Sequence, residues 1–257
     1  MSPGLQLTAF VTILRKEIRR FIRIWPQTLL PSAITMSLYF VIFGSLIGSR
    51  IGEMDGFDYM QFVVPGLIMM AIVTNSYSNV VSSFFGSKFN NSVEELLVSP
   101  TPNYVILMGY VVGGITRGLL VAIIVTLVSL LFTQLSIHSY AVVIVTVLMT
   151  STLFALGGFI NAVFANTFDD ISIIPTFVLT PLIYLGGVFY SMDLLPEFWA
   201  NVSKLNPLVY VINAFRYGVL GVSDVNLGFA FAMIIGFTVI AFAYSMHLLN
   251  SGTRLRQ

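Results

Sequence analysis

Residues 118–168 read GLLVAIIVTLVSLLFTQLSIHSYAVVIVTVLMTSTLFALGGFINAVFANTF and contain no Asp, Glu, Lys or Arg. A helix needs about 20 apolar residues to cross the hydrocarbon core of a bilayer, so this run is long enough for two crossings. Its one polar cluster, TQLSIHSY, covers residues 133–140 and marks the natural break. The stretch therefore predicts two membrane-spanning helices joined by a short polar turn.

The whole chain shares this character, because 57% of its 257 residues are hydrophobic and only 9% are charged. Soluble domains carry about 25% charged residues, so the composition indicates an integral membrane protein. Charge-free runs predict an all-α fold with six transmembrane helices, in one domain over residues 1–257. The helices are expected at about 26–48, 60–82, 104–132, 140–165, 171–191 and 227–250. No strands are expected, because the alternating pattern of a membrane barrel is absent.

The basic residues predict the orientation of these spans. An even number of spans places both termini on one side, which then carries eight Lys and Arg residues against three on the other. The first group comprises Arg15, Lys16, Arg19, Arg20, Arg23, Lys88, Arg254 and Arg256, and the second comprises Arg50, Lys204 and Arg216. Because positively charged loops stay in the cytoplasm, both termini are expected there.

Residues 7–25 predict an interfacial helix before the first span. Apolar and basic side chains alternate there at helical spacing. The apolar set comprises Leu7, Val11, Leu14, Ile18, Phe21, Ile22 and Trp25, and the basic set is Arg15, Lys16, Arg19, Arg20 and Arg23. Such a helix is expected to lie on the inner leaflet with its basic face toward anionic lipid headgroups. A simpler interpretation is an anchor that keeps the N-terminus inside, and both can hold together.

Residues 193–222 form an unusual segment on the predicted outer side. It is too apolar for a solvated loop and is interrupted by Pro196 and Pro207. Each half is too short to cross the membrane. Two re-entrant helices that dip into the outer leaflet before the sixth span are therefore expected.

The chain lacks the residues that several kinds of chemistry require. It contains no cysteine, and its two histidines are far apart, so no metal site is expected. Phosphate-binding loops, serine-hydrolase elbows and zinc-protease motifs are absent, so neither a cofactor nor a catalytic residue is expected. A net charge of +1 gives no basis for nucleic-acid binding. Asp169 and Asp170 are adjacent and are interpreted as loop residues, so a membrane hydrolase ranks last.

Small and polar residues inside the predicted spans leave two interpretations. The cluster Thr74, Asn75, Ser76, Tyr77 and Asn79 could line a transport pathway or bond to neighbouring helices. A pair of glycines four residues apart, Gly109 and Gly113, allows close helix approach within one subunit or between two copies.

Arg117 is the one charged residue expected within a span. It either snorkels to the inner interface or belongs to a substrate path. No carboxylate lies deep in a predicted span. This absence weighs against an ion-coupled secondary transporter or channel, which remains the alternative function.

Residues 91–102 read NSVEELLVSPTP and are exceptional in this apolar chain. Ser92 and Glu95 match the capping-box spacing, in which each side chain caps the backbone amide of the other. Pro100 disfavours helical geometry at Ser99, so the helix should end there. The pattern predicts a helix of about two turns over residues 92–99 in the first cytoplasmic loop, and a helix this short requires tertiary support.

The faces of this short helix predict how it is used. Val93, Leu96 and Leu97 share one side, while Glu94 and Glu95 make the helix acidic and a poor ligand for an anionic leaflet. The apolar side should therefore contact protein. We expect it to dock a soluble cytoplasmic partner, and the alternative is packing against its own subunit.

The C-terminal half resembles a known family. Residues 179–216 read LTPLIYLGGVFYSMDLLPEFWANVSKLNPLVYVINAFR, which is similar to the signature of type 2 ATP-binding-cassette (ABC) transporter permeases. The matching positions are Leu179, Leu182, Leu185, Gly186, Val188, Leu195, Pro196, Pro207, Leu208, Tyr210 and Arg216. EELLVSP, residues 94–100, resembles the first cytoplasmic loop of that family, and the likeness extends over the whole chain.

The resemblance implies a permease of the bacterial inner membrane that pairs with itself and with two copies of a separate cytoplasmic ATPase. The ATPase would bind the ATP, and the permease would hold no cofactor. Residues 92–99 would be the coupling helix that docks into the ATPase, with contacts from Ser92, Val93, Glu94, Glu95, Leu96 and Leu97. Export is the usual direction in the family, with drugs, lipids and lipid-linked glycans as typical cargo.

Overall fold

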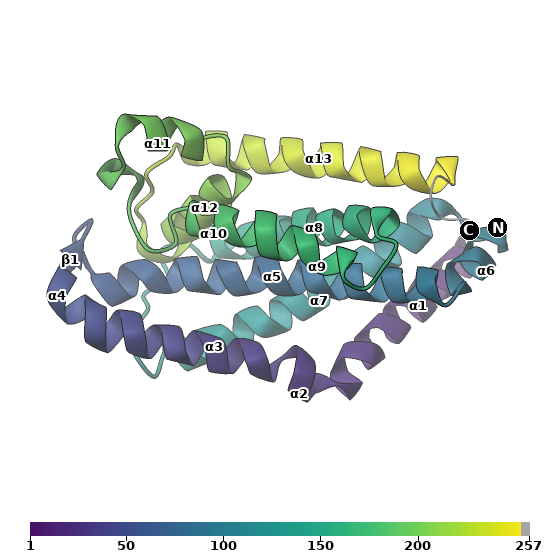
Figure 1. Cartoon of the computed structure of the whole chain (residues 1–257), viewed down its shortest axis with the longest axis horizontal. Helices are drawn as coiled ribbons and strands as arrows, with labels where there is room; N and C mark the ends of the chain where they lie inside the picture. The colour runs from purple at the N-terminus through teal and green to yellow at the C-terminus, as the bar shows by residue number, and fades with distance from the viewer. Residues whose placement is uncertain (253–257) are drawn as a thin grey trace.

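The computed structural model describes residues 1–252, so Arg254 and Arg256 of the basic count lie outside the described part. Figure 1 shows long helices running side by side along one axis. Within residues 1–252, five helices are long and apolar enough to cross a membrane. They are Trp25–Gly48, formed by α2 (Trp25–Thr28), α3 (Leu30–Phe40) and η1 (Val41–Gly48), and then α5 (Tyr59–Phe89), α7 (Asn103–Ser129), α8 (Tyr140–Phe164) and α13 (Leu227–Ser251). The all-α integral membrane class is confirmed.

The predicted fifth span is shorter than expected. Over 171–191 the chain forms α9 (Asp170–Ile174), the π-helical turn η2 (Pro175–Leu179) and α10 (Thr180–Tyr184), and the helix ends there. Two glycines follow, and Gly187 has a φ of +80°, which only glycine adopts without cost. The apolar sequence thus continues past the end of α10. Hydropathy alone predicts the apolar run but does not predict where the helix within it ends.

The predicted outer side holds three short helices and one hairpin. The helices are η3 (Met192–Leu194), α11 (Glu197–Ser203) and α12 (Pro207–Leu220). After the short α4 (Ser49–Ile51), β1 (Glu53–Met54) pairs antiparallel with β2 (Phe57–Asp58). Asp55 and Gly56 at the turn both have positive φ, as a tight two-residue hairpin requires. The expectation of no strands is therefore wrong at this one loop.

Helix α5 is the centre of the bundle and packs along α7 and α8. Nearly every side chain from Phe62 to Met69 is shielded from the surroundings. Helix α1 (Pro3–Arg23) crosses the inner half of the bundle, where Ile13 lies against Gly109 and Glu17 against Gly113. These two glycines therefore serve packing within one subunit, since a side chain at either position would displace α1.

Gly158 of α8 is a second close approach, because an added Cβ would collide with the carbonyl oxygen of Tyr77. We expect Gly158→Ala to destabilise the protein by about 1–3 kcal/mol, the usual cost of overpacking. The matched control is Gly157→Ala, whose Cβ would lie an ordinary 3.7 Å from the Tyr77 ring. Thermal unfolding of both variants in detergent checks this, and equal midpoints would contradict it.

Candidate functional site

The capped helix predicted near residue 92 exists as α6 (Ser92–Val98), but its cap differs from the prediction. Asn91 is the N-cap residue, with a left-handed backbone (φ 57°), and no side chain caps the helix. The Ser92 hydroxyl instead donates to the carbonyl oxygen of Ser87, 3.0 Å away on α5. The capping-box prediction is therefore wrong, because the Ser92 side chain hydrogen-bonds to the preceding helix α5 and not to the backbone of α6.

The apolar side of α6 also differs from the docking prediction. Val93 is only 2% exposed, and Leu96 and Leu97 pack against the same core of this chain. Glu95 is exposed, and Val98 is 85% exposed. Val93 therefore packs on its own subunit, Leu96 and Leu97 are half-buried there, and docking of a partner stays a prediction. The outward surface of α6, which we call the α6 outer face, consists of Glu95 and Val98 with half-buried Glu94 beside them.

The end of α5, which precedes α6, is hydrogen-bonded to the end of α8. Lys88, near the end of α5, is buried and donates to the carbonyl oxygens of Val163 (2.7 Å) and Ala165 (2.8 Å). These are among the final carbonyls of α8, which have no helical partner of their own. Phe168 closes the same corner, with its ring 5.0 Å from that of Phe89. A force on α6 would therefore be passed to α5 and α8 rather than absorbed by a loose loop.

In Figure 1, α5 lies between α3 and α9–α10, and it contacts both α3 and α9. From Phe62 to Lys88, the residues of α5 that are not buried form one row: Met70, Thr74, Ser78, Ser82 and Gly86, spaced by four residues. Neighbouring members of this row share a face of the helix, and we call the row the exposed stripe of α5. Sequence reasoning noticed polar residues here but did not separate this row from its buried neighbours.

The five polar residues singled out in the sequence divide accordingly. Thr74 lies on the exposed stripe. The others, namely Asn75, Ser76, Tyr77 and Asn79, are buried. The period of four along 70–86 was the signal that could have found the stripe.

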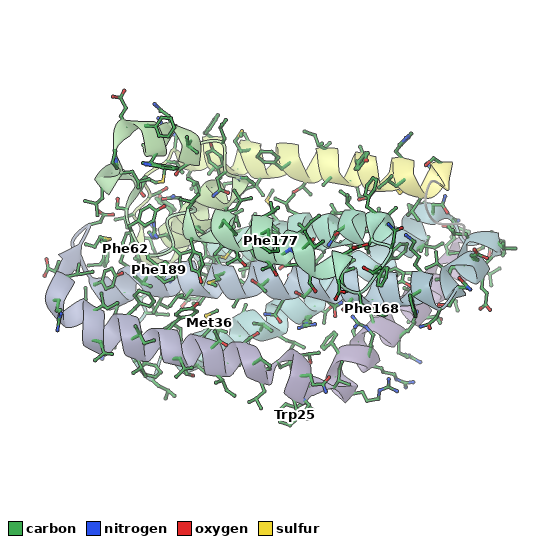
Figure 2. All side chains as sticks on the ribbon, viewed as in Figure 1. Trp25, Met36, Phe62, Phe168, Phe177 and Phe189 are labelled. Carbon is green, nitrogen blue, oxygen red and sulfur yellow. The ribbon has the colours of Figure 1, made fainter. Side chains whose placement is uncertain are left out.

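Aromatic side chains from α3, η1, α10 and the segment after α10 meet near the start of α5. The hydroxyls of Tyr39 on α3 and Tyr184 on α10 lie 3.2 Å apart. Phe189 stacks on Phe43 with ring centroids 4.5 Å apart, and its carbonyl oxygen accepts a hydrogen bond from Tyr59 (Figure 2).

Helix α1 is attached to the bundle by a face that the sequence did not predict. Ile13, Glu17 and Phe21 are buried, and desolvation by burial raises the pKa of the Glu17 carboxyl. The side chains of Leu7 and Trp25 are exposed, and Trp25 projects away from the bundle in Figure 2. Much of the expected apolar set thus remains available to lipid, as do Arg15, Arg19 and Arg23.

Arg117 neither snorkels nor faces an open path. It is 9% exposed and donates to the side-chain oxygen of Asn75 (2.9 Å) and to the backbone oxygen of Thr28 (3.1 Å). It therefore ties α7 to α5 and to the break at the start of the first span.

The four residues singled out in the outer segment lie in α11, α12 and their junctions. Pro196 precedes α11, and Pro207 is the first residue of α12. The Tyr210 hydroxyl donates to the Lys204 carbonyl, which joins the two short helices. These residues shape the outer segment and bring no catalytic group together.

Arg216 is fully buried in α12 and contacts three other parts of the chain. It donates to the Gly187 carbonyl oxygen, lies 3.9 Å from an Asp224 carboxylate oxygen, and stacks 3.8 Å from the centroid of the Phe62 ring. Asp224 in turn accepts from the backbone of Met192 at 2.8 Å. One guanidinium thus links α12, α5 and the chain around Gly187.

No group of three His, Cys, Asp or Glu residues that could hold a metal ion occurs among residues 1–252. Asp170 is the first residue of α9 rather than a loop residue, and its carboxylate accepts from the backbone amides of Asn166 (2.8 Å) and Thr167 (3.1 Å) in the preceding loop. These bonds hold the pKa of its carboxyl below the usual value. Asp169 beside it is exposed.

The described helices define a multi-pass membrane protein that carries the short surface helix α6 between two of its membrane-spanning helices. The chain belongs to the ABC-2 type transporter family, whose profile matches residues 8–220. The resemblance seen in the sequence is therefore confirmed. Membership makes the protein a membrane subunit of an ABC transporter and implies association with an ABC ATPase subunit.

Individual relatives agree with this assignment. The chain is 58% identical to the inner membrane transport permease YadH of Escherichia coli K12 over 248 residues, which is 96% of this chain and 97% of the relative. It is 24% identical over 216 residues to nodulation protein J of Rhizobium meliloti, covering 83% of this chain and 82% of the relative. Together with the apolar helices, these likenesses indicate a multi-pass inner membrane protein.

Proposed function

We propose that the chain is the permease of an ATP-driven exporter and that α6 is its coupling helix. The α6 outer face carries the argument: Glu95 and exposed Val98 stand on a helix whose opposite side is fixed to α5. An isolated apolar side chain beside an acid is a small, specific contact for a protein groove. The docking set is thus revised to Glu94, Glu95 and Val98, with Val93, Leu96 and Leu97 as internal support.

Both termini are proposed to lie in the cytoplasm beside α6. The Asn103 side chain at the start of α7 donates to the Asn250 side chain near the end of α13 at 2.9 Å. The next residue, Tyr104, donates to Gln6 of α1 at 2.6 Å. The two ends of the chain therefore share one side with α6, and the exposed cations of α1 favour the cytoplasm for that side.

The proposed pathway follows the exposed stripe of α5 and is completed by a second copy of the chain. Thr74, Ser78 and Ser82 supply hydroxyl groups to the stripe, and Arg20 of α1 donates to the Ser82 hydroxyl at 3.3 Å. Leu38 of α3 and Phe177 of η2 are exposed apolar residues on the flanking segments. In lipid, a polar line of this kind is stabilised by facing another protein surface. The aromatic cluster at Tyr39 and Tyr184 would then be the outer end of the pathway. Two ATPase copies, one at each α6, follow from the pairing and would bind the ATP.

An ion-coupled mechanism has less support. Glu17 is the only carboxylate-bearing residue among the buried ones in residues 1–252, and it lies on α1 rather than in a span. Transporters driven by ions usually place an ionisable group at membrane depth.

Affinity purification tests the proposal. The tagged chain, extracted from its own bacterial membranes in mild detergent, should bring down an ABC ATPase together with vanadate-sensitive ATP hydrolysis. Mixing two differently tagged copies should show that the chain pairs with itself. A purified chain that carries neither an ATPase nor a second copy would contradict the proposal.

A further inference from the structure

A second row of polar residues lies on α5, on the side that faces α1 and α7. Asn75, Asn79, Ser83 and Ser87 recur every four residues, and all four are buried. We call this row the α5 polar ladder. It is distinct from the exposed stripe, because each of its members lies one residue further along the helix and faces the protein interior.

The lower half of the ladder binds α1 and α7. The hydroxyl of Ser87 accepts hydrogen bonds from the Lys16 ammonium (3.2 Å) and the Tyr110 hydroxyl (3.1 Å). The hydroxyl of Ser83 donates to a Glu17 carboxylate oxygen at 2.5 Å.

The upper half binds two buried or half-buried guanidinium groups. Arg20 donates to both the side-chain oxygen (2.9 Å) and the backbone oxygen (2.8 Å) of Asn79. Asn75 accepts from Arg117 at 2.9 Å and donates to Ser32 of α3 at 2.9 Å. Each rung therefore joins α5 to a charged residue of another helix.

The two ends of the ladder are informative. At the inner end, the Ser87 backbone oxygen accepts from Ser92, the first residue of α6. At the other end, Arg117 holds the Thr28 carbonyl, where the chain turns from α1 into the first span. Only 12% of the most apolar window of that span is buried inside the bundle, so few of its residues are held by the rest of the chain.

The charged partners of the ladder differ in burial. Glu17 and Arg117 are buried, Arg20 is half-buried and Lys16 is exposed, and Glu17 is the one carboxylate among these four residues. Buried ionic groups are commonly no more stabilising than well-packed apolar side chains. Directional hydrogen bonds do, however, fix the register between helices, which apolar contacts allow to slip.

We propose that the α5 polar ladder transmits displacement of α6 through α1 to the first span, so that Asn79, Ser83 and Ser87 are positioning residues for transport. The inference rests on the proposed function, since it takes the ATPase as the source of that displacement. It adds α1 to the moving parts and gives its buried charged face a role beyond anchoring.

The test uses the complex of the chain with its co-purified ATPase in lipid nanodiscs. The chain has no cysteine, so Thr74→Cys places a single reporter on the exposed stripe. Alkylation by a water-soluble maleimide should slow by about fivefold or more when ATP and vanadate are added, within the usual range of coupling between sites. Ser83→Ala or Asn79→Ala in the reporter background should reduce this change to less than about twofold.

Two further variants separate transmission from folding. Ser83→Thr keeps the hydroxyl and should restore the response. Ser245→Ala removes a buried hydroxyl of α13 that bonds only within its own helix, and it should respond like the parent. ATPase binding should be equal in all variants.

A full response in the Ser83→Ala and Asn79→Ala variants would overturn the proposal. Loss of the ATPase from those variants would also overturn it, because the ladder would then merely hold α6 in place. If the unaltered chain itself binds no ATPase, the proposed function fails first, and the two failures are distinguishable.

Discussion

Replacing Glu95 by Arg and Val98 by Asp should leave the permease in the membrane and deprive it of its ATPase. Both side chains are exposed, so neither change disturbs packing within the chain. Reversing one charge and adding another on a docking face should cost at least about 2 kcal/mol of binding energy, as for an interface hot spot. We expect the co-purified ATPase to fall by at least about tenfold, since each tenfold change corresponds to about 1.4 kcal/mol.

Two controls show whether this loss comes from docking. Asp169→Arg reverses an exposed acid in a neighbouring loop and should leave ATPase binding intact. Leu97→Asp places a charge on the packed side of α6, so it should lower the thermal stability of the permease itself. If the Glu95/Val98 double variant retains the ATPase, α6 is not the docking element.

Replacing Arg216 by Ala should be among the most damaging single changes in the chain. The change leaves Asp224 nearly buried without its cation and removes the bond to Gly187. Losing one partner of a buried ion pair costs about 3–5 kcal/mol. For a chain of this size the midpoint of thermal unfolding should drop by roughly 10 °C.

Two further variants test whether the loss of stability comes from the broken ion pair between Arg216 and Asp224. Lys204→Ala removes an exposed cation from the same outer segment and should shift the midpoint by no more than about 2 °C. Arg216→Met with Asp224→Asn removes both charges and should recover more than half of the loss, because no isolated charge is left buried. A double variant as unstable as Arg216→Ala alone would show that the pair is not the cause.

The spans could be predicted because membrane thickness fixes how many apolar residues a crossing needs. That rule found α8 and the second half of α7 within one charge-free run. It overextended the fifth span, because α10 ends at Tyr184 while the apolar sequence continues. The prediction ended the second span at residue 82, whereas α5 continues to Phe89. The last two turns of α5 lie past the length that a membrane crossing needs, and they contact α6. The capping-box prediction was also wrong, because Asn91 rather than Ser92 is the N-cap residue and has a left-handed backbone conformation.

The sequence predicted the position of α6 in the chain but not which of its faces packs inward. The sequence located α6, yet which side packs inward depends on α5 and the core beneath it. The buried face of α1 was hidden for the same reason: Glu17 looks like a surface residue until Ser83 is found opposite it. The polar rows of α5 were visible as a period of four, but only the neighbouring helices decide which row is exposed.

The most direct measurement of the central claim is site-specific crosslinking from α6. Val98→Cys introduces a single cysteine, to which a benzophenone maleimide can be attached in native membranes. Illumination should link the permease to an ABC ATPase identified by mass spectrometry, while the same probe at Ile240→Cys, exposed on α13, should not. A Val98 probe that captures no ATPase, or no more than the Ile240 probe, would contradict the assignment of α6 as the helix through which ATP hydrolysis drives transport.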